Sequence, residues 1–153
     1  MTQCPIEERI ALQDLMTDYC YAVDALNSVD ALLSLFTEDA VLDFSDIGLP
    51  AMHGRAEHRR FYDGVFADMS HHTHYISNFR LVSYDGDGGD GTRAVMRAYV
   101  QGLGRSKDGN EVLVHVRYRM DCVKLAGAWK CNAYYIHAGM PMPGSLAEIH
   151  GER

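Results

Sequence analysis

Four long segments rich in Tyr, Val and Ile follow one another in the second half of the chain, and they limit the possible folds more than any other feature. The turns between them contain glycine, in DGDGGDG, KDGN and LAG. Strands joined by such short turns pair antiparallel. The sequence therefore predicts a four-stranded antiparallel meander over residues 72–84, 92–105, 111–124 and 128–138.

The first half of the chain has the periodicity of helices instead. Apolar residues recur at spacings of three and four from Pro5 to about Leu26, which predicts a long helix with one broad apolar face. A shorter helix over 29–36, a short strand over 40–44 and a third helix over 55–69 follow. Helices before a meander are typical of an α+β fold in which the helices cover the concave face of a curved sheet.

Length and charge limit the classes of partner. The 153 residues are 47% hydrophobic, which fits one domain, with a core at about 6–138 and a C-terminal tail at 139–153. The formal charge of −7 disfavours nucleic acid and membrane partners. The N-terminus lacks the apolar stretch of a signal peptide, and the four cysteines form no CxxC pair. We expect a cytoplasmic protein with reduced thiols and no metal.

The last turn of the meander decides which side chains share a face, and two registers compete. A two-residue loop would pair Cys122 with Cys131 but would mix polar and apolar residues on each face. A three-residue loop over 125–127 separates them better, so it is the preferred register. It pairs Val114 with Ala138, Val116 with Ile136, Tyr118 with Tyr134, and Met120 with Asn132.

In this register, three polar side chains point into the cavity, from Tyr118, Asn132 and Tyr134. His115 points outward. The outer face then carries His115, Arg117, Arg119, Asp121, Tyr135 and His137. Its mixed aromatic and charged content suits a subunit interface, so we expect a homo-oligomer, either a dimer or a trimer.

Two polar residues stand in apolar surroundings in the helical half and on the first long strand. Asp24 ends an apolar helical face, and His74 shares a strand face with Ile76 and Asn78. Taken singly, Asp24 is most simply a solvated helix-end carboxylate, and His74 a histidine bonded to the backbone. A metal site in the run 71–74 is disfavoured because adjacent strand residues face opposite ways. The two can meet only if the strand presents His74 to the concave face.

The chain resembles the SnoaL-like branch of the nuclear-transport-factor-like superfamily over residues 6–138. The resemblance rests most specifically on the spacing Tyr19-x4-Asp24 and on the run from His74 to Asn78. It implies a cone-shaped α+β barrel, and it implies that Asp24 and His74 form a catalytic pair. It also implies that Tyr19 and Tyr134 occupy positions in the substrate cavity.

The most similar branches are scytalone dehydratases, bile-acid 7α-dehydratases and hexachlorocyclohexane dehydrochlorinases. The dehydrochlorinases have a lysine where this chain has Tyr19 and an arginine where it has Tyr134. The cationic contacts for a leaving halide are therefore missing. Scytalone dehydratases use a second histidine on the strand that includes His115, which the preferred register turns outward.

These observations predict a cofactor-free lyase, most simply a dehydratase acting on a small cyclic or aromatic hydroxy compound. His74 would remove a proton, Asp24 would orient it, and the substrate would be bound by Tyr19, Tyr118, Asn132 and Tyr134. No nucleotide-binding or nucleophile motif is present. One alternative is an isomerase of the ketosteroid type that uses Asp43. The other is a noncatalytic module that binds a small ligand.

Overall fold

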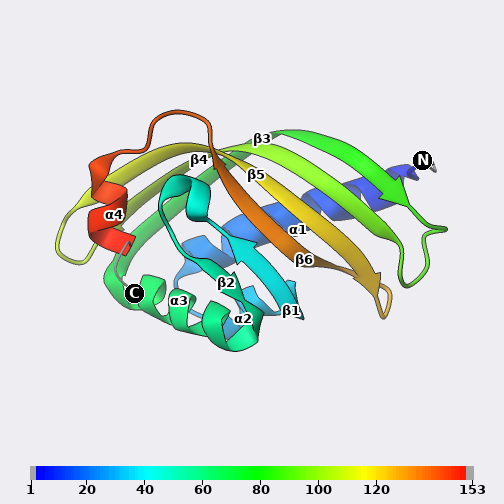
Figure 1. Cartoon of the computed structure of the whole chain (residues 1–153), viewed down its shortest axis with the longest axis horizontal. Coiled ribbons are helices and arrows are strands. Elements are labelled where there is room, and N and C mark those ends of the chain that lie inside the picture. Colours follow the sequence, from blue (N-terminus) through cyan, green and yellow to red (C-terminus); the bar gives the residue numbers. More distant parts are fainter. Residues whose placement is uncertain (1–2, 151–153) are drawn as a thin grey trace.

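The computed structural model describes residues 3–150 as one curved sheet with helices packed on its concave side (Figure 1). The sheet has six strands in the order β2-β1-β6-β5-β4-β3, and all neighbours pair antiparallel except β1 and β6. This is the predicted α+β barrel-like architecture. The elements are α1 (Ile6–Ala25), α2 (Val29–Leu33), β1 (Phe36–Asp43), η1 (Ser45–Ile47), β2 (Ala51–His53), α3 (Gly54–Asp68), β3 (Met69–Asp85), β4 (Arg93–Ser106), β5 (Glu111–Leu125), β6 (Ala128–Ala138) and α4 (Gly144–His150).

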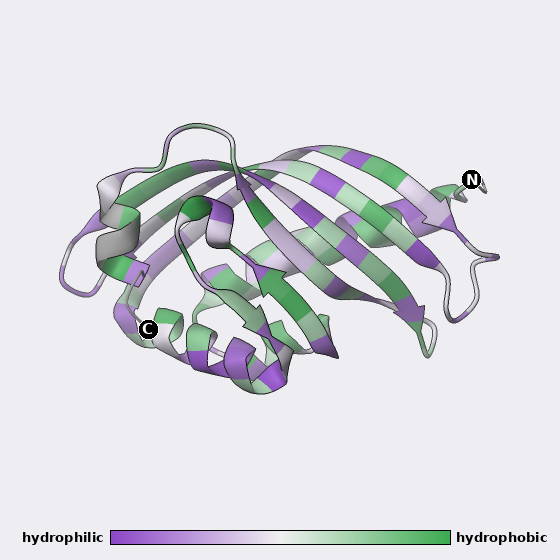
Figure 2. Cartoon of the chain, viewed as in Figure 1, coloured by the Kyte–Doolittle hydropathy of each residue, from purple (hydrophilic) through white to green (hydrophobic). Residues whose placement is uncertain are grey.

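The core lies between α1 and the concave face of the sheet. Hydropathy alternates along the long strands (Figure 2), and the inward residues of β5, such as Val116, Tyr118 and Met120, are buried. The apolar face of α1 supplies the other side of the core, with Leu12, Leu15, Met16, Tyr19, Cys20 and Val23 buried. α1 ends at Leu26, which adopts the left-handed conformation with a φ of 51°. None of the helices within residues 3–150 is long and apolar enough to cross a membrane.

The clearest differences from the predicted elements concern α2, β2 and α4. The second helix is shorter than expected, because Phe36 pairs with Cys131 of β6 and its segment joins the sheet. Strand β2 and helix α4 were not anticipated, and α4 occupies what was assigned as a tail. Elements as short as these have weak periodic patterns of their own, and tertiary packing supplies most of their stability.

The register of β5 and β6 corrects the predicted pairs. The turn is the two-residue loop, with Leu125 opposite Ala128 and Cys122 opposite Cys131. The register then shifts between Asp121 and Cys122, so that Asn132 is the extra residue of a β-bulge. Beyond the bulge, the pairs are Met120 with Tyr134, Tyr118 with Ile136, and Val116 with Ala138.

The faces of β5 and β6 nevertheless agree with expectation beyond the bulge. The observed register differs from the predicted one by two residues, and a shift of two preserves which face each side chain occupies. Tyr118 and Tyr134 are therefore buried on the inner side. His115 lies on the outer face, where its Nδ1 is 3.4 Å from Nε2 of Gln101.

Candidate functional site

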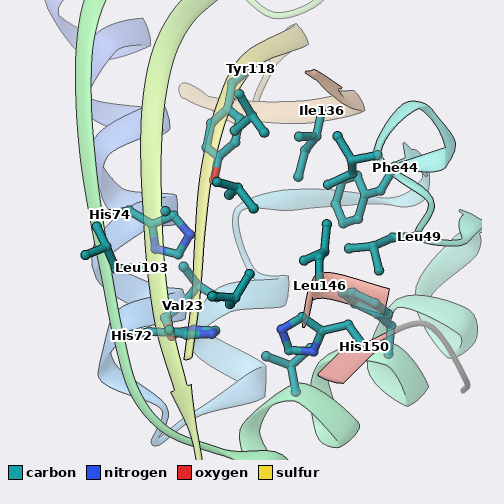
Figure 3. Close-up of a pocket in the computed structure, with 18 of the residues that line it drawn as sticks. Val23, Phe44, Leu49, His72, His74, Leu103, Tyr118, Ile136, Leu146 and His150 are labelled. Carbon is teal, nitrogen blue, oxygen red and sulfur yellow. The ribbon is translucent and has the colours of Figure 1, made fainter. Parts of the chain in front are cut away.

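A cavity opens between the concave face of the sheet and the helices α1, α3 and α4 (Figure 3). It encloses about 650 Å³ between protein atoms, part of which is open to solvent. Leu146 and His150 of α4 close one side. The wall is mainly apolar, and its polar side chains are Tyr19, Tyr62, Tyr118, His72, His74 and His150.

Asp24 and His74 form a close pair at this cavity. The Nδ1 atom of His74 lies 2.5 Å from Oδ1 of Asp24, and the backbone N–H of His74 donates to Oδ2 at 2.9 Å. The two side chains are only 24% and 14% exposed. The predicted proximity of Asp24 and His74 is thus confirmed. The interpretation of Asp24 as a solvated carboxylate is wrong.

The position of Asp24 explains why it needs this partner. It lies in the last turn of α1, where unpaired carbonyl groups and the helix dipole disfavour a negative charge. The two donors from His74 on the neighbouring strand compensate for that environment. The same two bonds fix the carboxylate and the imidazole relative to each other.

The Asp24 bond also sets the tautomer of His74. A carboxylate can only accept, so the Nδ1 atom of neutral His74 carries the proton and Nε2 has a free lone pair. The ring of His74 points into the cavity (Figure 3). Gly102 leaves room for this edge of the ring, because a Cβ there would lie 3.2 Å from Nε2. His74 therefore offers a hydrogen-bond acceptor, or a base, to a molecule in the cavity.

Tyrosine hydroxyls approach the cavity from the helices and from β5. The hydroxyls of Tyr19 and Tyr62 are 2.8 Å apart, and the ring of Tyr19 packs edge-on against Tyr118 at 5.9 Å. Burial raises the pKa of all three phenols well above the ordinary value, so they stay protonated donors. Tyr62, which lies on α3, was not among the predicted site residues.

Three predicted or alternative site residues do not line the cavity. Tyr134 is fully buried behind the wall, with its ring 4.9 Å from that of Tyr19. Asn132 is the extra residue of the bulge and is not part of the cavity wall. Asp43 accepts bonds from the backbone N–H and the hydroxyl of Ser45, at 3.0 Å and 2.6 Å, and so does not offer a base to the cavity.

A second histidine, His72, lines the cavity beside His74 and had no assigned role in the sequence. Its Nδ1 lies 3.3 Å from the carbonyl oxygen of Val23, in the last turn of α1. Burial, followed by the neighbouring His74, lowers the pKa of His72 to about 4. Strand alternation, which puts residues 72 and 74 on one face, is the signal that could have found it.

The part of the chain from residue 3 to residue 150 contains no group of three or more His, Cys, Asp or Glu side chains placed to hold a metal ion. His72 and His74 are neighbours, with ring centroids 5.6 Å apart, but each is already directed by a bond from Nδ1 to α1. Both imidazole rings are therefore held against α1 by hydrogen bonds from Nδ1.

Residues 5–134 match the profile of the SnoaL-like domain. The chain belongs to the SnoaL-like family. The match covers most of the chain and includes Asp24, His74 and the tyrosines of the cavity. The curated proteins contain no match to this SnoaL-like chain.

Solved structures share the whole architecture. A candidate aromatic ring hydroxylase from Novosphingobium aromaticivorans is 47% identical, with a TM-score of 0.89, over 96% of this chain and 99% of that one. A candidate scytalone dehydratase from the same species is 22% identical, with a TM-score of 0.77, over 88% and 86%. A hexachlorocyclohexane dehydrochlorinase from Novosphingobium barchaimii is 23% identical, with a TM-score of 0.69, over 91% and 92%. The last two likenesses show the common fold.

Proposed function

We propose that this SnoaL-like protein is a lyase that eliminates water from a small cyclic or aromatic hydroxy compound. The observation that supports the proposal is the His74 imidazole, which faces an apolar cavity while its Nδ1 atom is held 2.5 Å from the Asp24 carboxylate. Such an imidazole can take a proton through Nε2. A positioned general base of this kind accelerates proton transfer by about 10² to 10⁴.

In the proposed reaction, Nε2 of His74 removes a proton from the carbon next to a carbonyl group. The electron pair of the broken C–H bond is delocalised onto the carbonyl group, which forms an enolate. Asp24 stabilises the imidazolium that forms on His74. The enolate then expels the hydroxyl group on the adjacent carbon. His74 returns its proton to the departing oxygen, so the products are one unsaturated carbonyl compound and one water molecule.

The tyrosines supply the donors that this reaction needs. Tyr118 lines the cavity from β5, and the hydrogen-bonded pair Tyr19 and Tyr62 lines it from the helices. A protonated phenol can donate to the carbonyl oxygen as negative charge develops there. The raised pKa values keep these phenols protonated at neutral pH.

The shape and polarity of the wall favour a flat, largely apolar substrate. Phe44, Leu49 and Ile136 face the histidines across the cavity (Figure 3). The similar structures are named as an aromatic ring hydroxylase, a scytalone dehydratase and a hexachlorocyclohexane dehydrochlorinase. The second and third names describe eliminations, and the first names an aromatic ring. The proposed reaction and the proposed class of substrate agree with these names.

A product screen tests the proposal. The protein is incubated with a panel of hydroxylated cyclic ketones, and mass spectrometry measures loss of one water molecule. The variant His74→Ala should abolish the loss, whereas His71→Ala, at an exposed position on the opposite face of β3, should retain it. Gain of an oxygen atom would instead indicate hydroxylation. Binding without any change in mass would indicate an isomerase or a noncatalytic module, and either hydroxylation or unchanged mass would overturn the proposal.

A further inference from the structure

His72 is a polar group of the cavity that the proposed elimination does not use. Its ring lies beside that of His74, with the centroids 5.6 Å apart and the planes at 86°. His150 of α4 approaches from the other side, at 6.4 Å between ring centroids. His72 therefore lines the same cavity as His74, next to it (Figure 3).

The bond to Val23 determines what His72 can offer. A carbonyl oxygen can only accept, so the Nδ1 atom at 3.3 Å carries the proton of the neutral ring. The Nε2 atom then has a lone pair and no proton. Because the pKa is lowered to about 4, the ring remains in this neutral form at physiological pH.

Gly104 leaves space on the sheet for the imidazole ring of His72. It pairs with His72 across β3 and β4, and a Cβ at this position would lie 3.0 Å from Cδ2 and 3.4 Å from Nε2 of His72. Gly102 stands in the same relation to His74. The two glycines thus leave space under both imidazole rings, which lie along one face of β3.

We propose that His72 binds substrate, by accepting a hydrogen bond from a hydroxyl group that the substrate retains through the reaction. A departing hydroxyl needs a proton donor, and the Nε2 atom of His72 has no proton to give. The distance of 5.6 Å between the ring centroids of His72 and His74 is comparable with the width of one six-membered ring. Resting on the proposed function, this assigns the substrate class more narrowly: ring compounds with a second hydroxyl, phenolic or alcoholic, on the side away from the reacting carbon.

A matched pair of probes tests this role without turnover. Phenol and toluene differ only by a hydroxyl in place of a methyl group, and their binding to the folded protein can be measured by calorimetry or ligand-observed NMR. Wild-type protein should prefer phenol. The variant His72→Phe should lose about tenfold in phenol affinity, which is the value of one neutral hydrogen bond, and should bind toluene unchanged.

Two further variants make the result specific. His72→Gln keeps a carbonyl acceptor and should recover part of the preference for phenol, and His71→Phe, on the exposed face, should bind as wild type does. Equal loss of both probes in His72→Phe would indicate a packing role and overturn the proposal. Absence of a phenol preference in wild-type protein, or its persistence in His72→Phe, would overturn it as well.

A spectroscopic measurement on the wild-type protein avoids any effect of substitution on folding. Proton–nitrogen NMR of the histidine rings should show His72 as the Nδ1–H tautomer, and its Nε2 resonance should move on addition of phenol but not of toluene. An Nε2 resonance that does not respond to phenol contradicts the proposal. Absence of water loss in the product screen would refute the proposed lyase reaction, and retention of water loss by His74→Ala would refute the role of His74 as the base. Neither result would affect this binding test.

Discussion

Gly102 lies directly opposite His74 on the neighbouring strand, and its backbone forms the surface against which the imidazole rests. A Cβ at this position would be 3.2 Å from both Cδ2 and Nε2 of His74, and equally close to Cγ2 of Val114. The nitrogen that faces the cavity is therefore the one that any side chain at position 102 would crowd.

We expect Gly102→Ala to lower turnover on the order of tenfold to a hundredfold, because a small displacement of a catalytic group costs rate without unfolding the protein. The measurement is kcat on a substrate from the product screen, together with a thermal melt. Gly144→Ala is the matched control, since an added Cβ there meets no atom within 4 Å. Unchanged turnover in Gly102→Ala would show that the His74 ring tolerates a Cβ at position 102, and would contradict this prediction.

Replacement of the paired residues should affect turnover far more than replacement of the buried tyrosine. His74→Ala should cost about 10² to 10⁴ in kcat, and Asp24→Asn should approach that value because it loses the charge that stabilises the imidazolium. Tyr134→Phe should cost less than about tenfold, since its ring lies behind the cavity wall. If His74→Ala were active and Asp43→Asn inactive, the isomerase alternative would replace the dehydratase.

His72 makes the stability of the protein depend on pH. Its pKa is lowered from 6.5 to about 4, chiefly by burial, so the unfolded chain binds a proton in this range that the folded protein does not. The free energy of unfolding is therefore highest above pH 6.5, where His72 is neutral in both states, and falls as the pH is lowered from 6.5 to about 4. Denaturant titrations of wild type and His72→Phe at several pH values should show a shallower acid decline in the variant. Parallel curves would contradict the assignment.

Glu8 joins the start of α1 to the sheet. Its carboxylate accepts from Nζ of Lys124 and from Nε1 of Trp129, each at 2.6 Å, and the bond from Lys124 is the main cause of its lowered pKa. Glu8→Ala should reduce the free energy of unfolding by about 1 to 3 kcal/mol, measured in denaturant. Glu7→Ala, at the adjacent exposed position, should change it by less than about 0.5 kcal/mol.

Homo-oligomerisation remains a prediction, and the outer face of the sheet offers its test. Tyr75 and Tyr99 are 61% and 49% exposed there, and the guanidinium of Arg117 lies 4.7 Å from the centre of the Tyr99 ring. Aromatic and arginine side chains of this kind are enriched in interfaces between subunits. Sedimentation at micromolar concentration should show a dimer or trimer that Tyr99→Glu dissociates. A wild-type monomer would disprove the prediction.

The pairing of Asp24 with His74 was implied by the resemblance to SnoaL-like proteins, and strand alternation was compatible with it, whereas spacing alone left Asp24 as a solvated carboxylate. The sequence was not sufficient for the details of β6. The bulge at Asn132 adds one residue whose presence no periodic pattern reveals, and neither uninterrupted register contains it. The assignment of Asn132 and Tyr134 to the cavity failed for related reasons: the bulge displaces the first, and neighbouring rings cover the second.

His72 and α4 were missed because their roles arise from tertiary structure. The acceptor character of His72 depends on a carbonyl group at the end of α1, which is far away in the sequence. Helix α4 spans only seven residues, and Leu146 gains its significance from the cavity that it covers. Strand alternation places His72 on the face of His74, but local pattern shows neither the bond from its Nδ1 to Val23 nor the contact of α4 with the cavity.

The cavity combines parts with different freedom to change. The pair Asp24 and His74 comes from α1 and β3 and is fixed by hydrogen bonds between those two elements. Leu146 and His150, by contrast, enter the wall from α4, whereas both hydrogen bonds between Asp24 and His74 join α1 to β3. Substitutions in α4 could therefore change which molecules the cavity admits without removing those two bonds. Such a separation allows one scaffold to acquire new substrates gradually.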